Sequence, residues 1–285
     1  KVSFAPLKYL FAFSYRLLIT NIFQRFNWNI FSFILGKFYT RTDVGNYTKS
    51  AEWFNMGGEV VNGMVNAVAQ PALAKVVNDS ELQLHVFRKM LRFTAFVAFP
   101  LMFGLSLVSK EIIIIVITDK WIESAEMLQL LAIWGAFMPI QSMFTNLLVS
   151  CGRSRTFMWC TIVQGVLMLA ILLEVHSYGI KQMIVCYCIF NVVWLFVWFY
   201  FAKKEIAIRL TMFLRDVLPY MLLSAIVMYV AHLATVAVDD MFLRLVLKIA
   251  VSAPLYLTVA VMMRSNELKE ITEFLSKRNK RGSMI

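Results

Sequence analysis

Eight stretches of this sequence approach the length and apolarity that a helix needs to cross a bilayer, which is about 20 mostly apolar residues. They cover residues 9–35, 50–74, 91–117, 127–149, 156–174, 182–202, 217–238 and 243–263. The last six are plainly apolar, whereas the first two carry charged and amide side chains. A segment in hydrocarbon must satisfy its own backbone hydrogen bonds, and a helix does so internally. We therefore expect an all-α, polytopic membrane helix bundle.

The composition supports a membrane location and excludes two soluble classes. Hydrophobic residues make up 60% of the chain and charged residues 16%, against about 45–50% and about 25% in soluble proteins. A cytosolic enzyme with one buried core is excluded, as is a nucleic-acid-binding protein that uses the net charge of +11 along a groove. The four cysteines, at 151, 160, 186 and 188, lack metal-ligand spacing, and we expect them to be small apolar packing residues.

The basic residues predict the side of the membrane on which each loop lies. If the chain begins in the cytoplasm, its cytoplasmic segments hold 18 of the 28 Lys and Arg residues and the opposite segments hold 8. Positive residues accumulate in cytoplasmic loops, so we expect cytoplasmic N- and C-termini, with 264–285 as a basic cytoplasmic tail. The chain begins at Lys1 without a signal peptide, and we expect a fragment of a longer protein.

The first two spans each carry a helical face that is too polar for lipid. At about 100° per residue, the polar side chains of the first span, including Arg16, Asn21, Arg25 and Asn27, fill an arc of about 220°. The polar residues of the second span recur at spacings of three and four and form a stripe about 80° wide. They are Glu52, Asn55, Glu59, Asn62, Asn66 and Gln70.

These two faces predict a hydrophilic cavity. A charged side chain near the bilayer centre costs about 2.5–3.5 kcal/mol on insertion scales, so such residues face a bundle interior or a water-filled space. Arg16 and Arg25 are the candidate ligands of an anionic headgroup, because a guanidinium forms paired hydrogen bonds with phosphate oxygens. The candidate hydrogen-bonding groups for a hydroxyl-rich cargo are Asn21, Asn27, Asn55, Asn62, Asn66 and Gln70.

Glu59 and Glu52 are the candidate ion-coupling residues, since burial raises a carboxyl pKa and a neighbouring Arg lowers it. With helix ends expected at 34 and 50, Arg25 and Glu59 lie at similar depth, and Arg16 lies level with Asn66 and Gln70. A purely structural ion pair between Arg25 and Glu59 is the alternative interpretation.

No pattern in the sequence indicates covalent chemistry, a metal site or a cofactor. There is no Gly-rich loop followed by Lys and Ser or Thr, and the three histidines are far apart in the chain. We expect short external loops, the longest being 36–49 and 118–126. The last three spans, 182–202, 217–238 and 243–263, are uniformly apolar and are expected at the lipid-facing periphery, especially 182–202 with Trp194 and Trp198.

The segment 30–51, IFSFILGKFYTRTDVGNYTKSA, resembles the middle of Wzx-type O-antigen or polysaccharide flippases of the multidrug/oligosaccharidyl-lipid/polysaccharide exporter superfamily. The order and spacing of further motifs resemble the same family. They are Gln70-Pro71-Ala72-Leu73, Pro100 with Gly104-Leu105, Trp121, and Cys151-Gly152-Arg153-Ser154.

This resemblance implies a fold of two six-helix lobes around a central cavity, often with two additional C-terminal helices. Residues 1–202 would form the second lobe and 203–263 the two additional helices. The function implied is movement of an undecaprenyl-pyrophosphate-linked oligosaccharide across the bacterial inner membrane by alternating access. Arg16 and Arg25 would then meet the pyrophosphate, membrane lipid would surround the prenyl tail, and polysaccharide assembly proteins would be partners.

Two other functions stay open. A cation-coupled multidrug exporter of the same superfamily would favour acidic lining residues and an aromatic cage. A membrane polysaccharide polymerase or ligase would predict glycosyl transfer and a large periplasmic domain. The two arginines of the first span and the short external loops favour the flippase.

Overall fold

The computed structural model describes residues 5–262, and every regular element in that range is helical. The predicted all-α fold is confirmed. The elements are α1 (Ala5–Phe38), α2 (Arg41–Lys75), α3 (Ser80–Val116), the 3₁₀ turn η1 (Asp119–Trp121), α4 (Ile122–Gly135), α5 (Met138–Ser150), α6 (Ser154–Val175), the 3₁₀ turn η2 (His176–Tyr178), α7 (Ile180–Ile206), α8 (Leu210–Thr235) and α9 (Met241–Met262).

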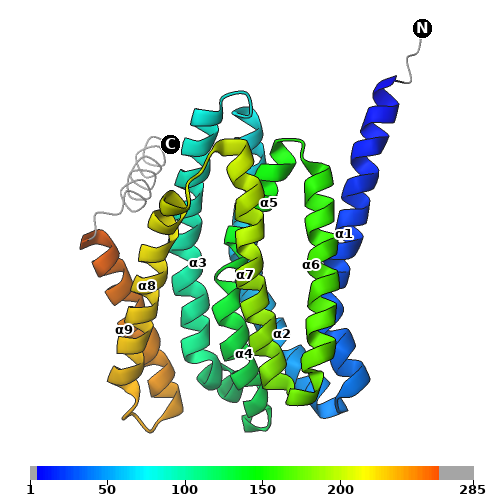
Figure 1. Ribbon diagram of the computed structural model, residues 1–285. Coiled ribbons are helices and arrows are strands. Elements are labelled where there is room, and N and C mark those ends of the chain that lie inside the picture. Colours follow the sequence, from blue (N-terminus) through cyan, green and yellow to red (C-terminus); the bar gives the residue numbers. More distant parts are fainter. Residues whose placement is uncertain (1–4, 263–285) are drawn as a thin grey trace, which may run out of the picture.

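Within residues 5–262 the helices run up and down as eight crossings, because α4 and α5 follow one another within a single crossing (Figure 1). Of these described crossings, six are long and apolar enough for a membrane: α3, α4 with α5, α6, α7, α8 and α9. The protein is therefore a multi-pass membrane protein. As the sequence indicates, α1 and α2 are the two more polar helices of the bundle.

The hairpin between α1 and α2 is much tighter than expected, because α2 begins at Arg41 and not at residue 50. Thr40 caps the helix: its hydroxyl accepts a hydrogen bond from the backbone N–H of Asp43, and the Asp43 carboxylate accepts one from the N–H of Thr40. This reciprocal capping box starts the helix outside the apolar stretch. The external segment expected over 36–49 is shorter still, since only Tyr39 and Thr40 separate the two helices.

The fourth crossing bends between Gly135 and Met138, where Pro139 lies in the first turn of α5. A proline there removes a backbone donor that the start of a helix leaves unpaired in any case. Gly135 allows a close approach at the bend, since a Cβ atom on it would overlap both Met102 and Phe54.

One face of helix α7 packs against α4, α5 and α6, whereas Val185, Ile189 and Val193 on its other face are exposed. Trp194 and Trp198 are buried, with Trp198 only 1% exposed. The expectation that 182–202 forms the lipid-facing periphery is wrong for this face of the helix. A helix that packs against protein and one that faces lipid are both apolar, so hydropathy does not separate them.

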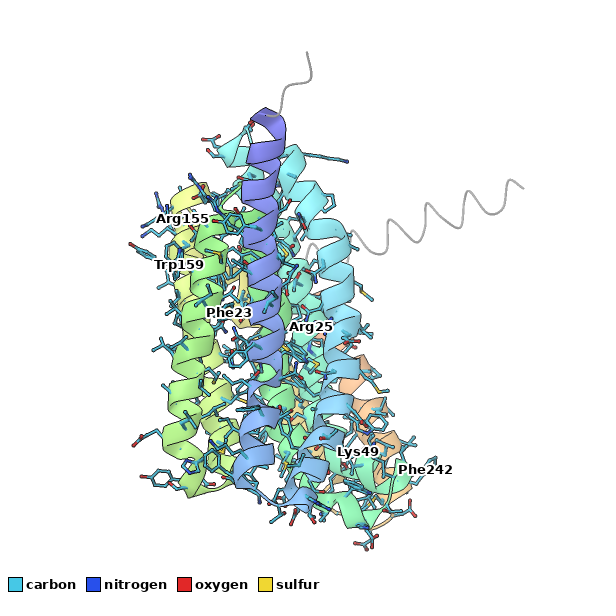
Figure 2. All side chains as sticks on the ribbon, turned by 90° about the vertical axis from the view of Figure 1, so that its right-hand side faces the viewer. Phe23, Arg25, Lys49, Arg155, Trp159 and Phe242 are labelled. Atoms are coloured by element: carbon cyan, nitrogen blue, oxygen red, sulfur yellow. The ribbon has the colours of Figure 1, made fainter. Side chains whose placement is uncertain are left out.

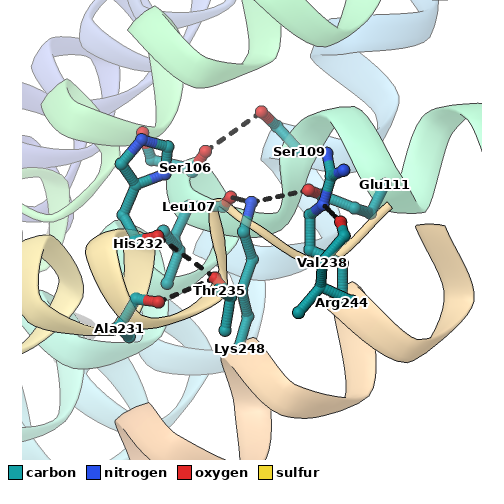
Figure 3. A network of polar contacts seen from close by, with 10 residues as sticks. All are labelled: Ser106, Leu107, Ser109, Glu111, Ala231, His232, Thr235, Val238, Arg244 and Lys248. Carbon is teal, nitrogen blue, oxygen red and sulfur yellow. Dashed lines mark hydrogen bonds and ion pairs between the residues drawn. The ribbon is translucent and has the colours of Figure 1, made fainter. Parts of the chain in front are cut away.

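Helices α8 and α9 form a pair that packs on α3, away from α1 and α6 (Figure 1). At one end of α3, Arg88 and Arg92 form ion pairs with the buried Asp216 of α8. At the other end, Lys248 of α9 pairs with the buried Glu111, as Figure 3 shows. The division at 202/203 into a lobe and two additional helices stays a prediction.

The two ends of the bundle differ in charge. The α2–α3, α5–α6 and α7–α8 turns lie at the same end as the start of α1 (Figure 1). Basic residues such as Lys75, Arg153, Arg155 and Lys203 lie in or beside these turns. The predicted basic tail, 264–285, lies outside the described residues.

Candidate functional site

Helices α1 and α2 meet at their hairpin and pack against different partners beyond it. Helix α1 lies along α6, whereas α2 lies along α4 and α5. The hairpin is held by Tyr39, whose hydroxyl donates to the carbonyl O of His176 at 2.5 Å. Burial, and then the negative charge of Asp43, raise the pKa of Tyr39 above 10.0, so the phenol stays protonated and can donate.

The predicted polar residues of α1 divide between two surroundings. Asn21 and Arg25 are exposed, and Arg16 is half-buried beside the Tyr15 ring. Figure 2 shows Arg25 near the middle of α1, on the side toward α2. Asn27 instead packs on α6, where its Nδ2 donates to the carbonyl O of Thr161 at 2.9 Å. Arg16, Asn21 and Arg25 therefore stay available to a ligand, while Asn27 joins two helices.

The acidic residues of α2 also differ in their surroundings. Glu59, near the middle of α2, is exposed and forms no ion pair with a described residue. Glu52 is exposed and pairs with Lys49 one turn away, at 2.8 Å. Of the two, Glu59 is the carboxylate that remains free for a ligand or a proton.

Arg25 and Glu59 do not lie at the same depth, contrary to expectation. At about 1.5 Å per residue, Arg25 lies about 20 Å from the hairpin end of α1, and Glu59 lies about 27 Å from the hairpin end of α2. The difference arises because α2 starts at Arg41. Glu59 is thus placed between the levels of Arg25 and Arg16, and no ion pair joins it to either arginine in the described chain.

The amides of α2 partly serve to attach α5. Ser142 Oγ donates to Asn62 Oδ1 at 2.9 Å, and Asn146 Nδ2 donates to Asn66 Oδ1 at 2.8 Å. Asn55 is half-buried, and Gln70 is exposed near the far end of the helix. The polar stripe of α2 therefore continues onto α5.

A partly open cavity of about 180 Å³ lies beside these amides, between α1, α2, α5, α6 and α7, with Trp134 of α4 also at its edge. Of the predicted residues, Asn27 and Asn62 border it. Gln141, Gln164 and Asn191 also border it and were not predicted. Gln164 and Asn191 are isolated amides within apolar spans, and Gln141 shares its span with Gln129 and Asn146; intramembrane amides of this kind are the signal that could have found them.

Among residues 5–262 no group of three or more His, Cys, Asp or Glu side chains is arranged to hold a metal ion. The polar side chains of α1 and α2 and the cavity beside them instead offer two guanidinium groups, one free carboxylate and a series of amides. This arrangement suits noncovalent binding of a large polar or anionic molecule.

Comparisons with known proteins agree with this architecture. A family described as "Polysaccharide biosynthesis protein" matches residues 1–126. The teichuronic acid biosynthesis protein TuaB of Bacillus subtilis is 24% identical over 247 residues, which cover 86% of this chain and 51% of that protein. The lipopolysaccharide biosynthesis protein WzxC of Escherichia coli is 26% identical over 133 residues, covering 47% of this chain and 27% of that protein.

A solved structure shares the fold. The lipid II flippase MurJ, in an inward closed conformation, superposes with a TM-score of 0.68 at 17% identity, covering 87% of this chain and 52% of MurJ. The predicted resemblance to Wzx-type flippases and the predicted fold are confirmed. This chain spans about half the length of TuaB and MurJ.

Proposed function

We propose that this chain forms one lobe, with two additional helices, of a flippase that moves an undecaprenyl-pyrophosphate-linked oligosaccharide across the bacterial inner membrane. One observation carries the proposal. Arg16, Arg25 and Glu59 lie within the central part of the neighbouring helices α1 and α2, and none of the three side chains is buried.

Charged side chains at these positions are unfavourable against acyl chains. Each charged side chain near the bilayer centre costs about 2.5–3.5 kcal/mol on insertion scales. These side chains must therefore meet water or protein. Half the length of MurJ lies beyond the region that this chain matches, and a second lobe opposite α1 and α2 would enclose the required wet cavity.

The exposed groups then have separate roles. Arg16 and Arg25 are nine residues apart on α1, or about 13 Å along the axis and about 180° around it, so they provide two separate positions, not one shared face, on a cationic path for the diphosphate. Asn21, Asn55 and Gln70 offer hydrogen bonds to glycan hydroxyls. Glu59 lies between the two arginine levels and is placed to exchange a proton or cation as the diphosphate passes, whereas Glu52 is already paired with Lys49.

The remaining parts of the proposal follow from the topology. The end of the bundle with the basic turns faces the cytoplasm, because Lys and Arg accumulate in cytoplasmic loops. Both termini of the chain are then cytoplasmic. Transport proceeds by alternating access without covalent chemistry, and enzymes of polysaccharide assembly supply and consume the lipid-linked glycan.

The test is glycan export in a strain that lacks its own flippase, complemented with the full-length protein. Arg25→Ala and Arg16→Ala should each reduce export by about 10-fold or more, because a hydrogen bond to a charged group contributes about 1.5–3 kcal/mol. Arg25→Lys should retain part of the activity, since it keeps the charge and loses the planar fork. Arg41→Ala is the matched control, because Arg41 is exposed at the start of α2.

Normal export by both alanine variants, at equal abundance in the membrane, would refute the cationic path. If strains complemented with the alanine variants export glycan normally but lose drug resistance, the multidrug exporter is favoured instead. Accumulation of unpolymerised glycan on the periplasmic side would favour the polymerase or ligase.

A further inference from the structure

We propose that the cavity between α1, α2, α5, α6 and α7 binds one neutral sugar residue of the transported glycan. This inference rests on the proposed function and adds to it a location and a ligand class. Six amide side chains border the cavity: Gln24, Asn27, Asn62, Gln141, Gln164 and Asn191. None of the described residues around the cavity carries a formal charge.

Amides suit a sugar because each offers both a donor and an acceptor, as each sugar hydroxyl does. Several of these groups are already held in place. Gln164 Nε2 donates to Asn191 Oδ1 at 3.1 Å, and Asn191 Nδ2 donates to the carbonyl O of Tyr187 at 2.8 Å. The wall of the cavity formed by α6 and α7 is therefore preorganised for a ligand.

Three buried polar atoms at the cavity have no hydrogen-bond partner within the described part of the chain. They are Asn27 Oδ1, Gln141 Oε1 and Trp198 Nε1. A buried polar group without a partner costs about 1–3 kcal/mol, and in native proteins such groups are usually met by bound water or a ligand. The three side chains border the cavity, and each would have to rotate to bring its unpartnered atom to a ligand.

Aromatic side chains complete the match. Trp28, Trp134, Tyr187 and Trp198 border the same cavity. A pyranose ring has polar edges and apolar C–H faces, so a cavity with amides and aromatic surfaces can bind both parts. Small-molecule sites in proteins commonly combine apolar walls with a few placed polar groups in this way.

The size and the position of the cavity indicate a ligand of one sugar ring. A volume of about 180 Å³ is of the order expected for a site that holds one sugar ring. Gln24, at the edge of the cavity, is exposed and adjoins Arg25 in the chain. A sugar bound here would therefore lie beside the proposed diphosphate path.

A cation is the competing occupant. Bound cations in proteins are usually neutralised by carboxylates, and the described residues around this cavity include no Asp or Glu. The neutral lining favours an uncharged ligand over a cation, and over an acidic sugar, whose carboxylate would have no cationic partner there.

The inference is tested with the purified full-length protein and methyl glycosides. The glycosides are those of the neutral monosaccharides that acid hydrolysis releases from the cell-surface polysaccharide of the source organism. At least one should raise the melting temperature of the wild-type protein. Gln141→Leu should abolish this shift without lowering the melting temperature measured without glycoside, because Gln141 Oε1 has no partner to lose among the described residues.

The matched control is Gln129→Leu, the same substitution at an exposed residue of the adjacent α4 that does not border this cavity. It should respond to the glycoside as the wild type does. In the complemented strain, Gln141→Leu should reduce glycan export by 10-fold or more, and Thr145→Phe, which fills the cavity from α5, should do the same.

Three results would overturn the sugar site. In the first, no glycoside raises the melting temperature of a wild-type protein that restores export. In the second, sodium chloride raises it whereas choline chloride and the glycosides do not. Equal stabilisation of the wild type and Gln141→Leu by a glycoside would also place the sugar elsewhere. If the wild-type protein fails to restore export in the first place, the proposed function fails rather than the sugar site.

Discussion

Breaking the ion pair between Lys248 and Glu111 should loosen α9 from α3 far more than removing both charges together. Lys248 Nζ lies 2.6 Å from Glu111 Oε1 and also donates to the carbonyl O of Leu107 at 2.9 Å (Figure 3). The side chains of Lys248 and Glu111 are only 6% and 2% exposed. Lys248→Met therefore leaves a buried carboxylate without its counter-ion, which costs about 3–5 kcal/mol in comparable proteins.

The double variant Lys248→Met/Glu111→Leu removes both charges and keeps similar side-chain volumes. Replacement of a buried ion pair by apolar residues is often neutral or stabilising, so we expect its unfolding free energy to lie within about 1 kcal/mol of the wild type. The difference between the single and double variants gives a coupling energy of about 2–4 kcal/mol in a double-mutant cycle.

The assay is equilibrium unfolding of the full-length protein in mixed micelles with an increasing fraction of sodium dodecyl sulfate. Lys110→Met is the matched control, because Lys110 is an exposed lysine at the same end of α3 and should change stability by less than about 0.5 kcal/mol. A cost below about 1 kcal/mol for Lys248→Met, or equal costs for the single and double variants, would refute the reasoning from burial.

Three further predictions concern the attachment of helices around the site. Asp216→Asn should lower the free energy of unfolding by about 3 kcal/mol or more, because it leaves two arginines of α3 without their buried counter-ion, and unfolding in mixed micelles would measure it. Gly165→Ala should lower the free energy of unfolding by about 1 kcal/mol in the same assay, because a Cβ atom on residue 165 overlaps Asn27 and breaks the hydrogen bond from Asn27 to α6. In a protein that already carries Asn27→Ala, the same substitution should change the free energy of unfolding little. Burial and the charge of Asp43 raise the pKa of Tyr39 in the folded protein. The stability that its hydrogen bond contributes should therefore be fully present below pH 10.0 and be lost as the pH rises through the higher folded-state pKa. The measurement is the absorbance of the Tyr39 phenolate, taken as the difference between the wild type and Tyr39→Phe, which should appear only above pH 10.0.

The helical polar faces of α1 and α2 could be predicted from the sequence because helical periodicity is a local property. The spacing of Glu52, Asn55 and Glu59 specifies a common side of α2 whatever surrounds the helix. The structure leaves these residues exposed or half-buried, together with Arg25 on α1. Their use in binding a diphosphate or glycan stays a proposal.

The level of one helix relative to the next could not be predicted in the same way. Hydropathy indicates where a segment leaves the hydrocarbon, whereas the first and last residues of a helix depend on capping residues, which can lie outside the apolar stretch. The capping box at Thr40 and Asp43 extends α2 beyond its apolar stretch and so shifts Glu59 away from the level of Arg25. Small polar caps of this kind carry little weight in a hydropathy profile.

By itself, the sequence determined that the chain crosses a membrane as a helical bundle and that two of its helices carry polar and charged side chains at helical spacing. Both conclusions depend on composition and on spacing within single helices. Only the tertiary structure decided that Trp198 lies in the interior and that amides from α1, α2, α5, α6 and α7 border one cavity. The physical reason is that lipid and a helix-packed core are both apolar, so the neighbours of a single amide such as Asn191 depend on contacts between segments far apart in the chain.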